Sequence, residues 1–358
     1  GRVVVPSGIT LTIEKGTIIK GAEGIETNAS ALIVAKGGKI DAQGTADEPI
    51  IFTSVLDNIG CGGSTDLGTE VKGKWGGIII LGNAPVSTEN GDDVGQIEGI
   101  SASLAYGAYG GSDAADNSGI LKYVSIRHGG ALIGEGNEIN GLTLGGVGTG
   151  TVIDHIEVLS NVDDGVECFG GTVNMSNILV GYVGDDAIDL DQNYSGTITN
   201  FIVVADNETD EGLEIDGPEN STHSDGLFSL VNGSVYTKDG LSSPADFKSK
   251  AQGNVENVKF TGYNTNELKI RASYQSNCSL DKTDAFTNLT DATPKLVFSG
   301  SEFGKVTVYT NSTADDQSDC DVMTGAQQNA EDAAVPTTAT GADASVFTWT
   351  WMAIEGKL

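Results

Sequence analysis

Residues 163–168 read DDGVEC, and the same pattern returns as DDAIDL at 185–190 and as DEGLEI at 210–215. The segments are spaced by 22 and 25 residues (185 − 163 = 22; 210 − 185 = 25). Such a spacing is typical of a solenoid, in which each turn of the chain adds one layer. Alternate residues of an extended strand share a face. The apolar residues of each segment therefore point to a core, and the acids between them point away from it.

A second apolar strand is expected ahead of the acidic turns. The segments concerned are 124–126, 156–158, 178–180 and 201–203. Two short strands in a repeat of 22–25 residues leave no room for a βαβ unit, which needs about 30 residues. The pattern predicts an all-β fold, a parallel β-helix.

The expected domain organisation is one elongated solenoid over residues 1–310. It is clearest over 1–240 and continues with longer loops over 241–310. We expect residues 311–358 to form a polar excursion, with a weak helix at 326–335, and then a final strand packed on the same solenoid. That strand is expected at 345–351, which read SVFTWTW.

The charge of the chain excludes some partners. A net charge of −31 and a pI near 4.1 argue against nucleic acid and anionic membranes, because both are bound through clusters of Lys and Arg. The longest apolar run, residues 75–81, is far shorter than the roughly 20 residues of a transmembrane helix. We expect a buried strand there and no membrane insertion.

The acidic residues themselves require a counter-charge. Between Arg127 and Lys238 the chain has nineteen carboxylates and no Lys or Arg. Strands of adjacent coils lie about 4.8 Å apart, where two carboxylates repel by roughly 3 kcal/mol at an effective dielectric of 20. Solvation of surface acids, raised pKa values, or a hard cation such as Ca²⁺ would offset this repulsion.

Calcium is the cofactor that this pattern predicts. Residues 189–195 also resemble the first half of an Asp-rich calcium loop, although Tyr194 stands where Gly is expected. The candidate metal ligands are Asp163, Asp164, Glu167, Asp185, Asp186, Asp189, Asp191, Asn193, Asp210, Glu211, Glu214 and Asp216.

The four cysteines are too few and too scattered for a zinc ribbon or a disulfide scaffold. Cys168 falls on the inward face, so we expect an inert buried thiol. Cys278 and Cys320 lie in polar, loop-like segments and are candidates for a disulfide outside the cell.

Several segments resemble a family of secreted bacterial right-handed parallel β-helix proteins whose members are mostly uncharacterised. The similar segments are 10–21, 31–34, 40–46, 48–54, 75–82, 164–171 and 347–351. The resemblance implies a right-handed solenoid, export, an extracellular or cell-surface location, and further sequence ahead of Gly1. It implies no reaction.

Two functions stay open. The first is an extracellular structural or adhesive protein, stiffened by calcium. It would associate with itself or with a surface partner through an uncapped first coil, and end-to-end association would build filaments. The alternative is a polysaccharide lyase or hydrolase, or a glycan-binding module, that uses the acidic face. We assign no catalytic residue: a uronate lyase needs a Lys or Arg base, and His128 and His155 fit turns better than catalysis.

Overall fold

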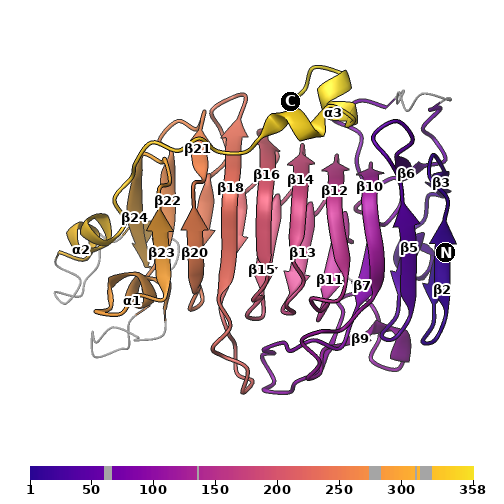
Figure 1. The fold of residues 1–358 in the computed structure, drawn as a ribbon, viewed down its shortest axis with the longest axis horizontal. Coiled ribbons are helices and arrows are strands. Elements are labelled where there is room, and N and C mark those ends of the chain that lie inside the picture. Colours follow the sequence, from indigo (N-terminus) through magenta and orange to yellow (C-terminus); the bar gives the residue numbers. More distant parts are fainter. Residues whose placement is uncertain (60–66, 135–136, 274–283, 311–312, 315–324) are drawn as a thin grey trace.

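The structure is a computed structural model that describes residues 1–358 apart from 60–66, 135–136, 274–283, 311–312 and 315–324. Figure 1 shows an elongated solenoid, in which successive coils stack side by side along the long axis. The described strands form two long sheets, here called sheet A and sheet B, and all pairs within them are parallel except the last pair of sheet A. The predicted parallel β-helix is therefore confirmed.

Sheet A runs, in spatial order, through β1 (Arg2–Val5), β4 (Ala31–Val34), β7 (Ile78–Leu81), β11 (Leu142–Gly145), β13 (Val166–Phe169), β15 (Ile188–Asp191), β17 (Leu213–Ile215), β19 (Ala245–Phe247), β22 (Glu267–Arg271), β24 (Lys305–Thr310) and β25 (Thr313–Ala314). Sheet B contains β2 (Thr10–Ile13), β3 (Ile18–Gly21), β5 (Lys39–Gln43), β6 (Ile50–Ser54), β10 (Gly119–Arg127), β12 (Val152–Leu159), β14 (Met175–Gly181), β16 (Thr197–Ala205), β18 (Phe228–Thr237), β20 (Gly253–Glu256), β21 (Lys259–Thr261) and β23 (Leu296–Ser299).

The remaining elements are short. A small antiparallel ribbon joins β8 (Gly95–Gln96) to β9 (Ala108–Tyr109). The helices are α1 (Ala285–Thr290), α2 (Ala326–Ala333) and α3 (Trp351–Ile354), with 3₁₀ turns at Glu26–Asn28, Ala105–Gly107 and Ala344–Phe347.

The repeat places equivalent residues on top of one another. Val166, Ile188 and Leu213 pair in register and are fully buried in the interior. Each fully buried aliphatic side chain of this size contributes about 1.5–3 kcal/mol, so the column forms a continuous core. The turns also stack, since the backbone N–H of Asp210 donates to the carbonyl of Asp185 at 3.1 Å. The predicted alignment of the acidic segments is confirmed.

A column of asparagines bends the strands of sheet B. Asn177, Asn200, Asn232 and Asn257 each have a left-handed backbone, with φ between 52° and 58°. Asparagine tolerates this conformation better than most residues. The amide of Asn200 donates to Asn177, and that of Asn257 donates to Asn232, each at 2.7 Å. We call these four residues the asparagine column.

His155 occupies the next position along the same line. It has a φ of 56°, its ring stacks on Tyr123 with centroids 4.1 Å apart, and its Nδ1 lies 2.7 Å from the carboxylate of Asp154. The expectation that His155 lies in a turn is wrong, because the residue belongs to β12 and its side chain is largely buried.

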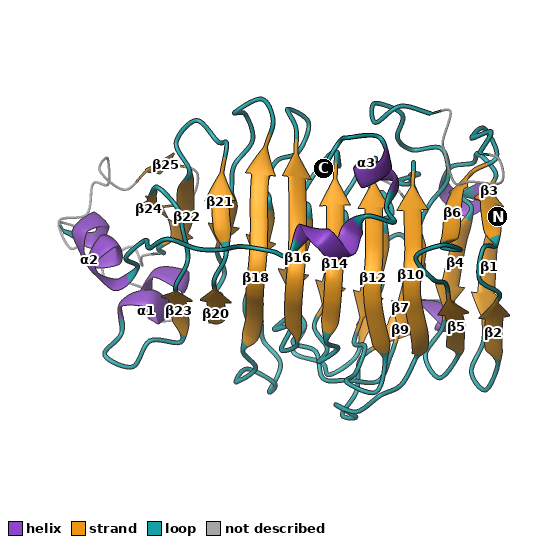
Figure 2. Cartoon of the chain, turned by 45° about the horizontal axis from the view of Figure 1, so that its top comes forward, coloured by secondary structure: helices purple, strands orange, loops and turns teal. Residues whose placement is uncertain are grey.

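The predicted final strand at 345–351 is wrong. Residues 339–358, here called the C-terminal strap, form a 3₁₀ turn and α3 and run across the outer face of sheet B (Figures 1 and 2). Phe347, Trp351 and Met352 of the strap bury Leu179 and Ile202 of that face. Sequence alternation alone could not reveal this role, because the strap covers an apolar surface instead of extending a sheet.

Hydrogen bonds fix the strap across several coils. The backbone N–H of Asp343 donates to Asn200 at 2.7 Å, and that of Thr340 donates to Asn257 at 2.8 Å. Further along, the N–H of Met352 donates to the buried carboxylate of Glu157 at 2.9 Å. The strap therefore links coils that are not adjacent in sequence.

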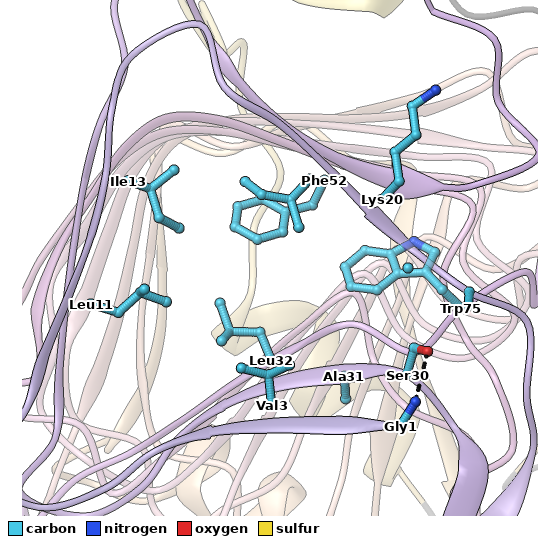
Figure 3. A pocket seen from close by; sticks show the side chains of 13 residues that line it. Gly1, Val3, Leu11, Ile13, Lys20, Ser30, Ala31, Leu32, Phe52 and Trp75 are labelled. Atoms are coloured by element: carbon cyan, nitrogen blue, oxygen red, sulfur yellow. Dashed lines mark hydrogen bonds between the residues drawn. The ribbon is translucent and has the colours of Figure 1, made fainter.

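The two ends of the solenoid differ. At the C-terminal end α1 and α2 pack against the core through Phe286, Leu289 and Ala330, and α2 confirms the helix predicted at 326–335. At the N-terminal end a pocket of about 310 Å³ opens among apolar residues that include Leu11 and Trp75 (Figure 3).

We predict that Asn200→Ala lowers the free energy of unfolding by about 2 kcal/mol. It removes hydrogen bonds to Asp343, worth about 1 kcal/mol each, and places a Cβ-bearing residue without side-chain compensation in the left-handed region. Asn200→Gly keeps the backbone permissive and should cost less. Chemical denaturation measures both. The exposed Asn28→Ala serves as control, and equal stability of the Asn200→Ala and Asn28→Ala proteins would contradict the assigned role of the column.

Candidate functional site

The outer face of sheet A changes its chemistry along the solenoid. Residues that pair in register on this face run in the order Ile33, Ile79, Thr143, Glu167, Asp189, Glu214, Asp246 and Lys269. The face is thus apolar at one end and acidic in the middle, and the basic Lys269 follows the acids, ahead of Thr307 on β24. We call Glu167, Asp189, Glu214 and Asp246 the acidic ladder.

The chain supplies cations for the later part of the ladder. Lys248 lies 2.5 Å from Glu214 and 3.5 Å from Asp216, and Arg271 makes a two-pronged contact with Asp246. Lys269 pairs with Glu211. These basic residues follow the acidic stretch in sequence and reach it because successive coils stack.

The earlier part of the ladder has no such partner. Among the residues that the structure describes, no ion pair involves Asp163, Asp164, Glu167, Asp185 or Asp189. Their carboxylate oxygens nevertheless converge. Asp164, Glu167 and Asp189 form one buried group whose oxygens lie within 4.8 Å of one another, and Asp163, Asp164 and Asp185 form a second, more exposed group with the same spacing.

Burial is the main reason that these carboxyls resist ionisation. It raises the pKa of Asp164, Glu167 and Asp189 well above the usual range, and the neighbouring carboxylates raise each pKa further. At the more exposed Asp163, burial and the charges of Asp185 and Glu138 raise the pKa to about 6. The group holds protons unless a cation replaces them.

The twelve predicted ligands are only partly brought together. Seven fall into three groups with ligand spacing: Asp163, Asp164 and Asp185; Asp164, Glu167 and Asp189; and Asp189, Glu214 and Asp216.

The other five predicted ligands lie outside these groups among the described residues. Asp186 accepts a hydrogen bond from the backbone N–H of Glu211 at 2.7 Å, while Glu211 itself pairs with Lys269. The side chain of Asn193 donates to the backbone at His223 and accepts from Gln252. Asp191 lines a groove, and Asp210 donates its backbone N–H to Asp185. The resemblance of residues 189–195 to a calcium loop therefore does not correspond to one ligand cluster.

The cysteine predictions have different outcomes. Cys168 is fully buried, which confirms its predicted interior position, and burial raises the pKa of its thiol. Cys278 and Cys320 lie outside the described residues.

A groove of about 440 Å³ opens beside the ladder, between sheet A and the long loop that contains β8 and β9. Tyr109 and Phe169 line it with ring centroids 5.9 Å apart, and the Tyr109 hydroxyl donates to Gln192 at 3.0 Å. Its polar lining residues are Thr88, Glu89, Asn90, Gln96, Glu98, Asp191, Gln192 and Glu219. Burial and the nearby Asp216 and Glu219 raise the pKa of Asp191 to about 7.

Sequence reasoning missed most of this groove. Glu89, Gln96, Glu98 and Tyr109 come from the loop between β7 and β10, which has no counterpart in the repeat. The usable signal was the length of that loop, since long loops in compact domains are often functional.

The described residues thus define a parallel β-helix protein with an acidic groove on one outer sheet. A family model described as a pectate-lyase-like β-helix domain matches residues 1–353, and the chain belongs to this family. No curated protein and no solved structure matches the chain significantly. No helix among the described residues is long and apolar enough to cross a membrane.

We predict that, in the presence of a chelator, the melting temperature falls as pH rises from about 4 to about 7. The pKa is about 6 for Asp163 and about 7 for Asp191 and Glu211, against about 4 for acids in the unfolded chain. The folded state therefore binds more protons than the unfolded chain in this window, so its stability decreases as the pH rises.

Thermal scans at a series of pH values measure this trend. Asp163→Asn should flatten its lower part, whereas Glu14→Gln, a change at an exposed residue remote from the ladder, should not. A melting temperature that rises through the same window would show that the buried acids are not protonated in the folded protein.

Proposed function

We propose that this chain is an extracellular polysaccharide-binding module, and that the groove on sheet A holds the glycan. The observation that carries the proposal is the groove itself, which combines aromatic and hydrogen-bonding side chains on an outer sheet of a pectate-lyase-like β-helix. Its volume of about 440 Å³ falls in the range of small-ligand sites, roughly 300–1,000 Å³.

The chemistry of the lining suits sugar hydroxyls. The carboxylates of Glu98 and Glu219 accept hydrogen bonds, and the amides of Gln96 and Gln192 both donate and accept them. One carboxylate oxygen of Glu219 is buried without a hydrogen-bond partner. An unpaired buried acceptor is costly, so rotation of this carboxylate toward a hydroxyl donor in the groove would be favourable.

Binding is favoured over cleavage by the charges of the groove. Its described lining residues contain no Lys, Arg or His, so none of them supplies the base that β-elimination beside a uronate requires. Acid pairs on adjacent coils have a spacing near that of retaining glycosidases, and hydrolysis is therefore the alternative that a glycan screen must test.

A structural or adhesive role at the cell surface is compatible with glycan binding, and calcium bound along the acidic ladder would stiffen such a protein. Self-association belongs to the same proposal. The apolar pocket at the first coils (Figure 3) supports contact through that end. A head-to-tail filament has less support, because α1 and α2 cover the opposite end of the core.

We predict that the double variant Glu98→Gln/Glu219→Gln binds its glycan roughly tenfold more weakly, a loss of about 1.4 kcal/mol. Both changes keep the shape of the side chain and remove its charge. A glycan array identifies the ligand, calorimetry compares the affinities, and product analysis reports any cleavage. Glu14→Gln, outside the groove, is the matched control.

The proposal fails if the wild-type chain binds no polysaccharide in the presence of calcium. It also fails if the double variant Glu98→Gln/Glu219→Gln binds the glycan as tightly as the control Glu14→Gln. Release of shortened or unsaturated products would make the protein an enzyme and replace the binding role with a catalytic one.

A further inference from the structure

We propose that Asp164 and Glu167 from one coil and Asp189 from the next form a buried calcium site, with the side-chain carbonyl of Asn140, from the preceding coil, as a fourth ligand. One ion would then link three successive coils of the solenoid. The inference deepens the calcium part of the proposed function and is independent of the glycan part.

The geometry of the three carboxylates suits a single ion. One oxygen from each lies within 4.8 Å of the others. Oxygens that bind Ca²⁺ at 2.3–2.6 Å lie no more than about 5 Å apart. Mg²⁺ gives up its water reluctantly and usually keeps several waters in its coordination shell. A buried group of protein oxygens therefore suits Ca²⁺ better than Mg²⁺.

Unpaired buried oxygens point independently to a missing ligand. Asp189 is 8% exposed, and its Oδ1 has no hydrogen-bond partner. Asn140 is 6% exposed, and its Oδ1 also lacks a partner, while its Nδ2 donates to Glu167. Rotation of this amide by half a turn would direct the carbonyl oxygen toward Glu167. An ion at this position would satisfy both oxygens.

Neighbouring contacts leave the required atoms available. Asp164 uses Oδ1 to accept the backbone N–H of Asp186 at 2.9 Å, which orients the carboxylate and leaves Oδ2 for an ion. Glu167 accepts a hydrogen bond from Asn140 through Oε2, and no hydrogen bond among the described residues uses its Oε1. Asp189 pairs in register with Glu167 on the adjacent strand. Glu167 and Asp189 are therefore held by paired strands, while Asp164 lies in the turn before β13.

The other two acidic groups are weaker candidates. Lys248 already neutralises the group of Asp189, Glu214 and Asp216 through contacts with the last two. The group of Asp163, Asp164 and Asp185 includes the exposed Asp185 and shares Asp164 with the buried site. Water competes for exposed ligands, so the fully buried group is the favoured site.

Calcium also resolves the electrostatic cost of this part of the ladder. Among the described residues, none of the three carboxylates forms an ion pair with a Lys or Arg side chain. A divalent cation bound between them would replace the repulsion between adjacent coils with attraction. The coils that carry the three ligands are then held together by one ion.

The test uses the full chain after treatment with a chelator. Titration with CaCl₂ in a calorimeter should show one site per chain, and a calcium concentration about 100-fold above Kd should raise the melting temperature by roughly 4 °C. Asp189→Asn should weaken calcium binding at least tenfold and abolish most of this rise. Asp47→Asn, at an exposed acid outside the cluster, should behave as wild type.

Any of three results would overturn the site. The wild-type chain could show neither a heat of calcium binding nor a rise in melting temperature, Asp189→Asn could bind calcium as tightly as the wild type, or the wild type could bind Mg²⁺ from MgCl₂ as tightly as Ca²⁺. If Asp189→Asn does not fold, Glu167→Gln replaces it, and the wild-type stoichiometry still decides. If the wild-type chain binds glycan but no calcium, only this inference is wrong. If it binds calcium but no glycan, only the glycan-binding function is wrong.

Discussion

Stacking in register at the spacing of parallel strands is the constraint on which this structure depends. It places each side chain about 4.8 Å from its equivalents on the neighbouring coils. For Val166, Ile188 and Leu213 the consequence is a dry continuous core. For Glu167 and Asp189 the same geometry would bring like charges together if both carboxyls were ionised, at a cost of roughly 3 kcal/mol per pair at an effective dielectric of 20.

The repulsion between these acids is reduced in different ways along sheet A. Lys248, Lys269 and Arg271 neutralise the later acids, while Asp164 and Asp186 accept backbone hydrogen bonds from the next coil. The earlier acids are buried and have raised pKa values. The position of the groove follows from the same gradient, because the loop that forms its wall packs on the apolar end of the sheet, around Ile79 and Leu81.

Part of the outer face of sheet B is apolar and must be covered. This face carries apolar residues such as Leu179 and Ile202, which the C-terminal strap covers. The asparagine column bends the strands and also offers amide groups that hold the strap at Asp343 and Thr340. One recurring residue thus sets the path of the strands and anchors the segment that closes this face.

The amino-acid sequence by itself determined the solenoid, the inward and outward faces and the alignment of the acidic turns, because alternation and a fixed repeat length are local properties. Only the tertiary structure decided which acids meet Lys248 or Arg271, which remain unpaired beside Asn140, and where the strap lies. These contacts join residues that are distant in sequence and absent from the repeat, so no periodicity records them. The groove depends on the loop that contains Glu98 and Tyr109 in the same way.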